Sequence, residues 1–380
     1  MSVSTLSVER LFLSSFRSYE RADIRFSPKV NTLSGPNGAG KTNLLEAIAY
    51  MAWGRSPRNA RDADLPTHGH GQFVIQVTYD QAAADNHISA SSQLMIHYRA
   101  EQPRLLSLDG KPILPRQLYG RLLVVFFSPD DLWLLKGAPT VRRTLLDRLL
   151  IQAEPKYADT YRRYQHVLLQ RNATLRSIRA RRADRRLLAV WDAPLLEHGT
   201  QIIRYRARAT AALSSLASRT YADLSGPRES LRCLYIPAVG VVAHPEPDAK
   251  WEYIFEEALS RQREHDLMTA STSVGPHRDD LEALISGHSA RHFSSQGQQR
   301  TAVLALKFAE RSYLQTVSGH LPILLVDDVL SELDPFRRRA LEELLATEGQ
   351  VFVTTAGIEQ IDGLSHASRF CIHAGEVVPQ

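Results

Sequence analysis

The sequence lacks the features that mark secreted, membrane-spanning and metal-knuckle proteins. Its 380 residues include only two cysteines, Cys233 and Cys371, which excludes a multi-disulfide framework and any C-x-x-C metal pair. The first ten residues lack the basic and then apolar order of a secretory signal, and the longest apolar runs, such as residues 122–127, are too short to cross a bilayer. We therefore expect a cytoplasmic protein.

The net charge of the chain is also small. The formal net charge is +5 at pH 7, a mild basic bias that favours polyanionic partners without identifying them. The length allows two or three domains and a sizeable core. Function therefore has to be sought in local motifs.

The clearest motif is the octapeptide GPNGAGKT, which fits the phosphate-binding pattern G-x-x-x-x-G-K-[ST] at every constrained position. Residues 30–34 before it predict a short strand, and apolar residues at helical spacing after it predict a helix that ends near Gly54. In such a loop Lys41 reaches the β- and γ-phosphates and Thr42 ligates Mg²⁺. The alternative, an accidental lysine in a glycine-rich turn, leaves these flanking elements unexplained. We predict that a nucleoside triphosphate is bound by Gly35, Pro36, Asn37, Gly38, Ala39, Gly40, Lys41 and Thr42.

A second motif lies near the other end of the chain. Residues 322–328 form a continuous apolar run that ends in two carboxylates, the pattern of a strand buried in a parallel sheet. Asp327 is the candidate Mg²⁺ ligand opposite Thr42. Asp328 is the candidate to orient or deprotonate the attacking water. A buried strand capped by a solvated turn is the alternative for this segment alone.

Two loops flank that acidic strand. Residues 293–300 place serine, glycine and glutamine before an expected helix, and residues 331–335 form a turn before a charged helix that begins near Phe336. Serine and glycine at a helix start make an anion site, although such a loop is more often only a helix cap. The order of all four motifs is more specific than any one of them.

Together the motifs resemble those of the ATP-binding cassette ATPases, and within them the chromosome-maintenance and Rad50-like branch. The resemblance implies an α/β fold, namely a P-loop ATPase head of mixed sheets and helices with an inserted, mainly helical arm. It identifies residues 294–298 with the signature motif, in which Ser295, Gly297 and Gln298 of one subunit contact the γ-phosphate held by another. It therefore implies a homodimer with two ATP molecules at its interface and catalytic roles for Lys41, Asp328 and Ser295.

Further short motifs occur along nearly the whole chain, at residues 16–19, 35–42, 126–132, 137–143, 146–147, 170–172, 275–280, 295–301 and 325–334. Together they resemble those of the bacterial RecF family of DNA replication and repair ATPases. This narrower resemblance implies ATP and Mg²⁺ as cofactors and a weak, DNA-stimulated ATPase that acts as a switch. Implied partners are single-stranded and gapped DNA and RecR, with RecO and RecA in the same pathway of RecA loading and SOS induction.

The sequence departs from the broad cassette pattern at two places and from the pattern of the RecF relatives at a third. Asp328 stands where most members have a longer glutamate, from which we expect slow hydrolysis. Thr354 or Thr355 follows the next strand in place of a switch histidine, so a hydroxyl would have to approach the γ-phosphate. Residues 56–59, Ser-Pro-Arg-Asn, differ from the Ser-His-Arg-Thr expected of the relatives, which leaves a nucleotide role for Arg58 open.

Composition divides the chain into three segments. We expect the N-terminal part of the head at residues 1–127, an inserted helical arm at 128–271 and the C-terminal part of the head at 272–380. Two antiparallel helices with a charged tip at residues 179–186 form the arm. Its dense positive charge is either a phosphate-tracking surface or an ordinary solvated face. The arginines concerned are Arg162, Arg163, Arg171, Arg176, Arg179, Arg181, Arg182, Arg185 and Arg186.

Three alternatives remain at this stage. A transporter ATPase subunit shares the motifs but would not show salt-sensitive DNA binding. An SMC-like protein that organises chromosomes structurally needs a longer coiled coil than residues 132–271 allow. A nuclease fused to this head needs a further cluster of acidic metal ligands, which we do not find beyond Asp334.

The segment 275–280 is either part of the dimer interface or a tight turn between strands.

Overall fold

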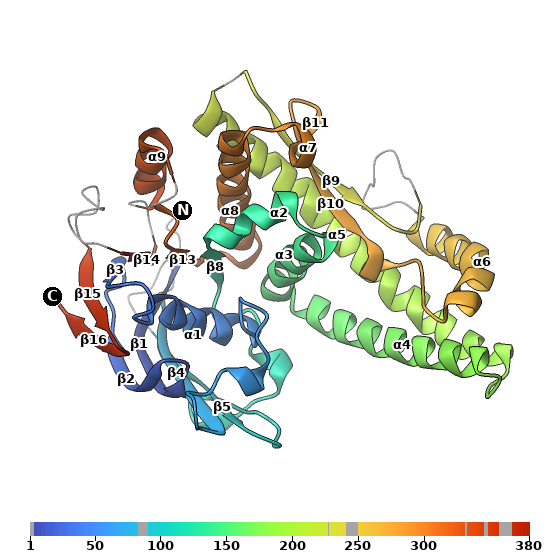
Figure 1. The fold of residues 1–380 in the computed structure, drawn as a ribbon, viewed down its shortest axis with the longest axis horizontal. Coiled ribbons are helices and arrows are strands. Elements are labelled where there is room, and N and C mark those ends of the chain that lie inside the picture. Colours follow the sequence, from blue (N-terminus) through green and yellow to red (C-terminus); the bar gives the residue numbers. More distant parts are fainter. Residues whose placement is uncertain are drawn as a thin grey trace. The chain divides into compact units, whose positions relative to one another are not determined.

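The structure is a computed structural model that describes residues 4–82, 90–226, 228–240, 250–330, 333–345, 349–356 and 367–380. The chain forms two compact units, the first made of residues 1–131 and 303–380 and the second of residues 132–302 (Figure 1). The second unit therefore interrupts the first in sequence. It ends at residue 302, beyond the boundary that we placed at 271.

The first unit contains a seven-stranded sheet of mainly antiparallel strands in the order β12-β1-β4-β5-β6-β7, with β2 also paired to β1. In β1 the buried side chains change from Leu6 and Val8 to Leu11 and Leu13, because a register shift between Val8 and Arg10 moves the inward face by one residue. The strands are β1 (Ser4–Phe16), β2 (Tyr19–Arg25), β4 (Gln72–Ala82), β5 (Ala90–Arg99), β6 (Leu105–Leu108), β7 (Lys111–Pro112) and β12 (His320–Leu321).

A six-stranded sheet of the same unit carries the motifs, in the order β16-β15-β3-β14-β13-β8. All neighbours in it are parallel except β15 and β16, and every residue of β13 and β14 is buried, which explains their continuous apolar sequence. The predicted strands before the glycine loop and the carboxylates are confirmed. The strands are β3 (Val30–Ser34), β8 (Val124–Phe127), β13 (Ile323–Asp327), β14 (Val351–Thr355), β15 (Ser368–His373) and β16 (Glu376–Pro379).

Helix α1 (Lys41–Trp53) begins directly after the glycine loop and contacts strands of both sheets. Because it is covered on both sides, nearly all of its side chains are buried and it shows little amphipathic character. Gly54 adopts a left-handed conformation and its N–H returns to the Tyr50 carbonyl, which ends the helix where the sequence predicted.

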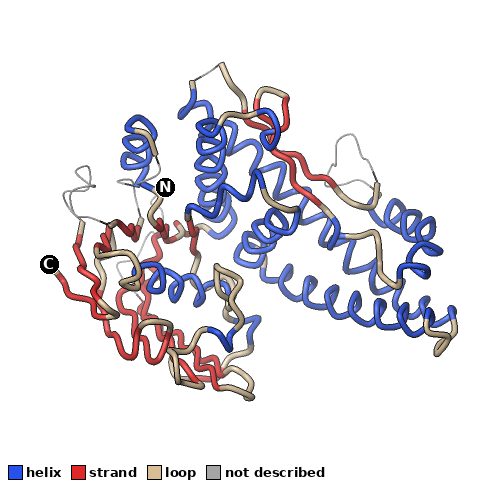
Figure 2. Tube along the Cα trace, in the orientation of Figure 1, coloured by secondary structure: helices blue, strands red, loops and turns tan. Residues whose placement is uncertain are grey.

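The second unit is mainly helical (Figure 2). Helices α4 and α5 pack against each other, and α3 and α6 contact both, so the predicted helical pair is confirmed. A three-stranded antiparallel sheet in the order β11-β10-β9 completes the unit. Its elements are α2 (Trp133–Lys136), α3 (Pro139–Ala153), α4 (Pro155–Arg179), α5 (Ala189–Ser225), β9 (Leu231–Ile236), α6 (Trp251–Thr269), β10 (Asp280–Ile285), β11 (His288–Ser289) and α7 (Ala290–Phe293).

Two further helices follow. Helix α8 (Gln296–Ser318) begins at the predicted signature segment, and α9 (Pro335–Leu345) begins at the predicted turn. Within the described ranges, none of the helices combines the length and the apolar character that a bilayer crossing requires. Short 3₁₀ turns occur at Asp62–Asp64, Pro115–Gln117, Pro129–Leu132, Arg185–Leu188 and Pro276–Arg278.

Candidate nucleotide-binding site

The glycine loop leaves β3 and turns into α1 through backbone conformations that favour glycine. Gly35, Gly38 and Gly40 have φ angles of 150°, 82° and 113°. A Cβ atom on Gly35 would lie 2.2 Å from the Ile372 carbonyl oxygen of β15, so no other residue fits there without moving that strand. The neighbouring strand thus holds the start of the loop in place.

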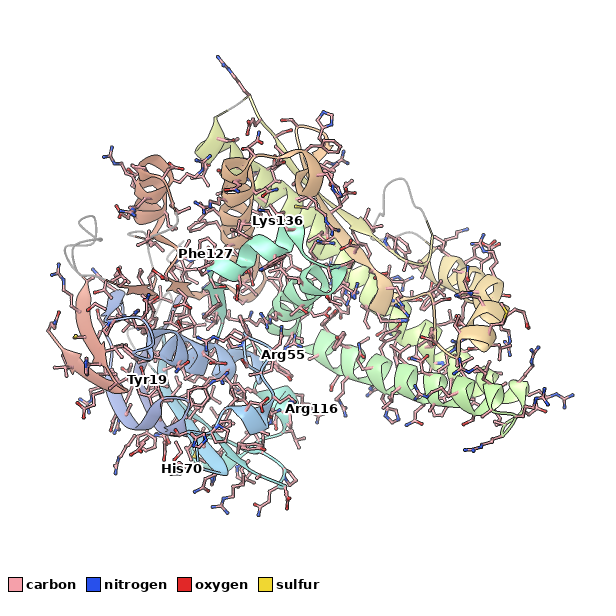
Figure 3. The ribbon with its side chains drawn as sticks, in the orientation of Figure 1. Tyr19, Arg55, His70, Arg116, Phe127 and Lys136 are labelled. Carbon is pink, nitrogen blue, oxygen red and sulfur yellow. The ribbon has the colours of Figure 1, made fainter. Side chains whose placement is uncertain are left out.

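Lys41 and Tyr19 fix the carbonyl groups of this loop. The Lys41 side chain is 7% exposed, and its Nζ donates to the carbonyl oxygens of Gly35 at 2.6 Å and Pro36 at 3.0 Å. The buried Tyr19 hydroxyl, labelled in Figure 3, donates to the Gly40 carbonyl at 3.0 Å. The ammonium group therefore lies against the loop that it is predicted to serve, with its charge available to phosphate oxygens.

The acidic strand meets the glycine loop at Asp327. Its Oδ1 accepts hydrogen bonds from Thr42 Oγ1 at 2.9 Å and from Thr354 Oγ1 at 2.8 Å. Burial raises the pKa of Asp327 above its ordinary value, while the two hydroxyl donors and the nearby positive charge of Arg58 act in the opposite direction. Hydroxyl and carboxylate oxygens are the ligands that Mg²⁺ prefers, so Thr42 and Asp327 fit the ion assigned to them.

Asp328 occupies a special backbone position. Its φ angle is 50°, a left-handed conformation that aspartate tolerates better than most residues, and its N–H donates to Thr354 Oγ1 at 2.9 Å. The Thr354 hydroxyl therefore positions the Asp327 side chain and the Asp328 backbone together. Of the two threonines considered in place of a switch histidine, Thr354 is therefore the one that bonds to both aspartates.

A buried glutamate in α1 was not singled out from the sequence. Glu46 is fully buried and accepts hydrogen bonds from Arg17 at 2.9 and 3.0 Å and from Ser56 Oγ at 2.5 Å. Arg58 lies 3.4 Å from the same carboxylate and donates to Asn43 Oδ1 at 3.2 Å. This cluster ties the first turns of α1 to residues 56–58. Its only sequence signal is a charged residue within the apolar run of residues 44–53.

The signature segment lies in the second unit at the start of α8. Ser295 Oγ accepts from the Gln298 N–H at 3.2 Å, and Gln298 Oε1 accepts from the Ser295 N–H at 2.8 Å. This reciprocal pair is a capping box. The segment therefore acts as a helix cap, which was the alternative interpretation of its sequence. Gln298 Nε2 donates to Glu229 at 2.7 Å, which anchors the loop. Ser295 is exposed and its hydroxyl can still donate its own proton, whereas Gly297 is half-buried.

The loop after the acidic strand is described only in part. Ser331 and Glu332 lie outside the described residues. Asp334 caps α9, because its Oδ1 accepts from the Arg337 N–H at 3.1 Å and its side chain pairs with the Arg337 guanidinium.

The fold separates the arginines of the arm into two groups. Arg171 is fully buried and pairs with Asp192 at 2.8 Å and Asp266 at 2.7 Å, so it belongs to the packing of the arm rather than to its surface. Arg185 is exposed and pairs with Glu264 at 3.3 Å. The exposed members are Arg162, Arg163, Arg176, Arg179, Arg181, Arg182, Arg185 and Arg186.

Comparison with known proteins gives consistent matches over nearly the whole chain. The family model "RecF/RecN/SMC N terminal domain" matches residues 7–375. The "DNA replication and repair protein RecF" of Moorella thermoacetica is 39% identical over 353 residues, which cover 93% of this chain and 90% of that protein. Two solved structures of the "recombination mediator protein RecF", one named RecF-ATPrS and one RecF-ATP, are each 30% identical, with TM-scores of 0.90 and 0.89. The first covers 100% of this chain and 99% of its own, and the second covers 99% and 98%.

Proposed function

Since this chain belongs to the RecF/RecN/SMC family and, within it, to the RecF proteins of DNA replication and repair, we propose that it is an ATP-dependent switch that binds DNA during recombinational repair. One observation carries the proposal. Asp327 accepts hydrogen bonds from Thr42 of the glycine loop and from Thr354 of the adjacent strand. A phosphate loop, a hydroxyl and a buried carboxylate thus meet in one place, as nucleotide hydrolysis requires.

This geometry supports a specific set of nucleotide roles. The backbone of residues 35–42 holds the phosphates, Lys41 supplies positive charge, and Thr42 and Asp327 hold Mg²⁺. Bound Mg²⁺ would neutralise charge on the phosphate oxygens. Asp328 orients and deprotonates the attacking water. Its side chain is one methylene shorter than the glutamate of most cassette ATPases, so we expect slow turnover suited to a switch.

Dimerisation links this site to the signature segment of a second copy. Ser295 Oγ is held by the capping box yet exposed, and it donates its proton to the γ-phosphate bound by the partner. The Gly297 N–H and Gln298 act beside it. ATP binding therefore favours the dimer and hydrolysis releases it, because only the triphosphate offers the γ-phosphate to both subunits.

The DNA-binding role rests on charge and on relatives. The exposed arginines of residues 176–186 extend from the tip of the arm and suit a phosphate backbone. The solved relatives are described as recombination mediators of the RecFOR pathway. We therefore place the protein in the cytoplasm, on single-stranded or gapped DNA, where it acts with RecR and RecO in loading RecA and in SOS induction.

Nucleotide binding and turnover test this proposal with two substitutions and one control. Lys41→Ala removes the loop ammonium and should abolish binding of a fluorescent ATP analogue. Lys29→Ala removes an exposed lysine and should leave binding unchanged. Asp328→Asn should bind the analogue normally but lose steady-state hydrolysis. If Lys41→Ala bound the analogue as tightly as the Lys29→Ala control, the proposed site would be wrong.

A further inference from the structure

Two motifs that the nucleotide site does not use come together in the second unit. Arg142 of α3 forms a bidentate ion pair with Asp280, with distances of 2.7 and 2.8 Å. The adjacent Arg143 donates from Nη1 to the Asp279 carbonyl at 2.6 Å. The segment 137–143 thus binds the segment 275–280, although more than half of the second unit separates them in sequence.

A buried ionic network holds the second of these segments in place. Arg206 of α5, which is 1% exposed, donates to Asp147 at 2.7 Å, to Asp279 at 3.2 Å and to the Pro276 carbonyl at 2.6 Å. Tyr235 also donates to Asp279. Buried ion pairs contribute little net stability relative to apolar packing, so such a network is better explained by the need to hold a loop in one position.

Arg143, Asp147, Arg206 and Pro276 of these residues line a pocket of about 230 Å³ that is open to solvent. His277 in its wall is neutral, because burial above all, together with the charges of Arg278 and Arg143, lowers its pKa to about 4. Its Nε2 lies 3.0 Å from the Thr272 carbonyl and must carry the proton, so its Nδ1 accepts from Tyr164. The pocket is lined by Thr140, Arg143, Thr144, Asp147, Tyr161, Tyr164, Gln165, Arg206, Pro276 and His277.

Arg143 adds a positive charge to the wall of this pocket, which also contains the carboxylate of Asp147. Its guanidinium is half-buried and bonds to a backbone carbonyl, and in the described part of the chain it forms no ion pair with a carboxylate. Burial and the nearby Arg206 lower the pKa of Arg143, while the charges of Asp279, Asp280 and Asp147 act in the opposite direction. The charge of Arg143 is therefore only partly compensated.

We propose that this pocket is a second phosphate site, in which the Arg143 guanidinium binds a phosphoryl oxyanion. A guanidinium matches phosphate oxygens in geometry, and the hydroxyl group of Thr140 in the wall can donate to them. The volume is below that of pockets for drug-sized ligands, so it suits one phosphate group better than a whole nucleotide. The group belongs either to a nucleic acid backbone, in which case the inference rests on the proposed DNA binding, or to free phosphate.

The nucleic acid form is tested with the full-length protein and a fluorescent oligothymidylate at several salt concentrations. Arg143→Gln should weaken binding about tenfold and lower the slope of log affinity against log salt by about one, because one phosphate contact is lost. Arg232→Gln is the matched control, since Arg232 is an exposed arginine of the same unit that does not line the pocket. It should change affinity less than twofold. If both variants lost the same affinity, the loss would come from the change in overall charge and the proposal would be wrong.

Inorganic phosphate tests the pocket independently of DNA. In a Lys41→Ala background, which removes the ammonium of the glycine loop, phosphate should raise the melting temperature of the protein. Adding Arg143→Gln should abolish that shift, and Arg143→Lys, which keeps the charge but not the planar fork, should restore part of it. If phosphate still raised the melting temperature of the Arg143→Gln variant, the proposed phosphate site would be wrong. If the protein with native residues failed to bind oligothymidylate, the proposed DNA-binding function would fail while this measurement would still decide the pocket.

Discussion

Replacing Thr354 by valine removes a hydroxyl that bonds to both Asp327 and Asp328 and leaves the side chain at nearly the same size. Thr354 is 1% exposed, donates to Asp327 Oδ1 at 2.8 Å and supplies the acceptor for the Asp328 N–H at 2.9 Å. A hydrogen bond to a charged group contributes about 1.5–3 kcal/mol, and a buried N–H without an acceptor costs about 1–3 kcal/mol. Part of this cost disappears when Asp327 takes up a proton, since burial already raises its pKa. We expect unfolding to become easier by about 2–4 kcal/mol.

The functional consequence concerns Mg²⁺ rather than the nucleotide itself. Residues that orient a metal ligand typically change metal affinity by about 10–100-fold when they are replaced. Titration of Mg²⁺ into the protein with a fluorescent ATP analogue should therefore show a half-saturating concentration at least about tenfold higher for Thr354→Val. Thr354→Ser retains the hydroxyl and should keep the half-saturating Mg²⁺ concentration close to that of the unmodified protein. A Thr354→Val protein with unchanged Mg²⁺ dependence would refute the assignment of Asp327 as a ligand positioned by Thr354.

Two further predictions concern the loop at residues 275–280. His277 has a pKa of about 4 in the folded protein and about 6.5 when unfolded, so the stability it contributes is complete above about pH 6.5 and is lost as pH falls toward 4. The loss is at most roughly 3 kcal/mol, and denaturant unfolding at several pH values should show a shallower slope for His277→Gln than for the unmodified protein. A Cβ on Gly275, at φ 122°, would lie 2.7 Å from the Tyr164 hydroxyl and 2.9 Å from Phe255. Gly275→Ala should therefore cost roughly 2–4 kcal/mol of unfolding free energy, against about 1 kcal/mol for Gly287→Ala, where φ is also positive but the space is open. Equal losses at the two glycines would show that the close contact is not real.

The elements that carry the nucleotide site could be predicted because each is contained in one contiguous stretch. The strand before the glycine loop, the helix that stops at Gly54 and the apolar strand ending at Asp327 all follow local periodicity and known turn chemistry. Ser295 was also foreseen at the start of a helix. Its partner in the capping box, Gln298, lies only three residues away.

The contacts between these elements could not be predicted in the same way. Thr354 meets Asp327 because β14 pairs in parallel with β13, and a single sequence contains no direct signal of strand order. The convergence of Arg142 with Asp280 likewise depends on how α3 packs on β10. Among the arginines of the arm, Arg171 resembled its neighbours in sequence until the fold buried it.

The end of the inserted unit shows another limit of composition. The change from helical to mixed composition suggested a boundary at residue 271, yet residues 272–302 pack with the helical unit. The reason is physical. Asp279 and Asp280 pair with Arg206 and Arg142 of the helices, and β10 pairs along its whole length with β9.

The most direct test of the account is the oligomeric state of the purified protein with and without ATP, measured by size-exclusion chromatography with light scattering. We predict a monomer without ATP, a dimer with ATP, and a long-lived dimer for Asp328→Asn. Ser295→Arg should bind ATP and remain a monomer, whereas Ser215→Arg, at an exposed serine on α5, should dimerise normally. A Ser295→Arg protein that forms the ATP-dependent dimer as readily as the Ser215→Arg control would contradict the claim that the signature of one copy completes the nucleotide site of another.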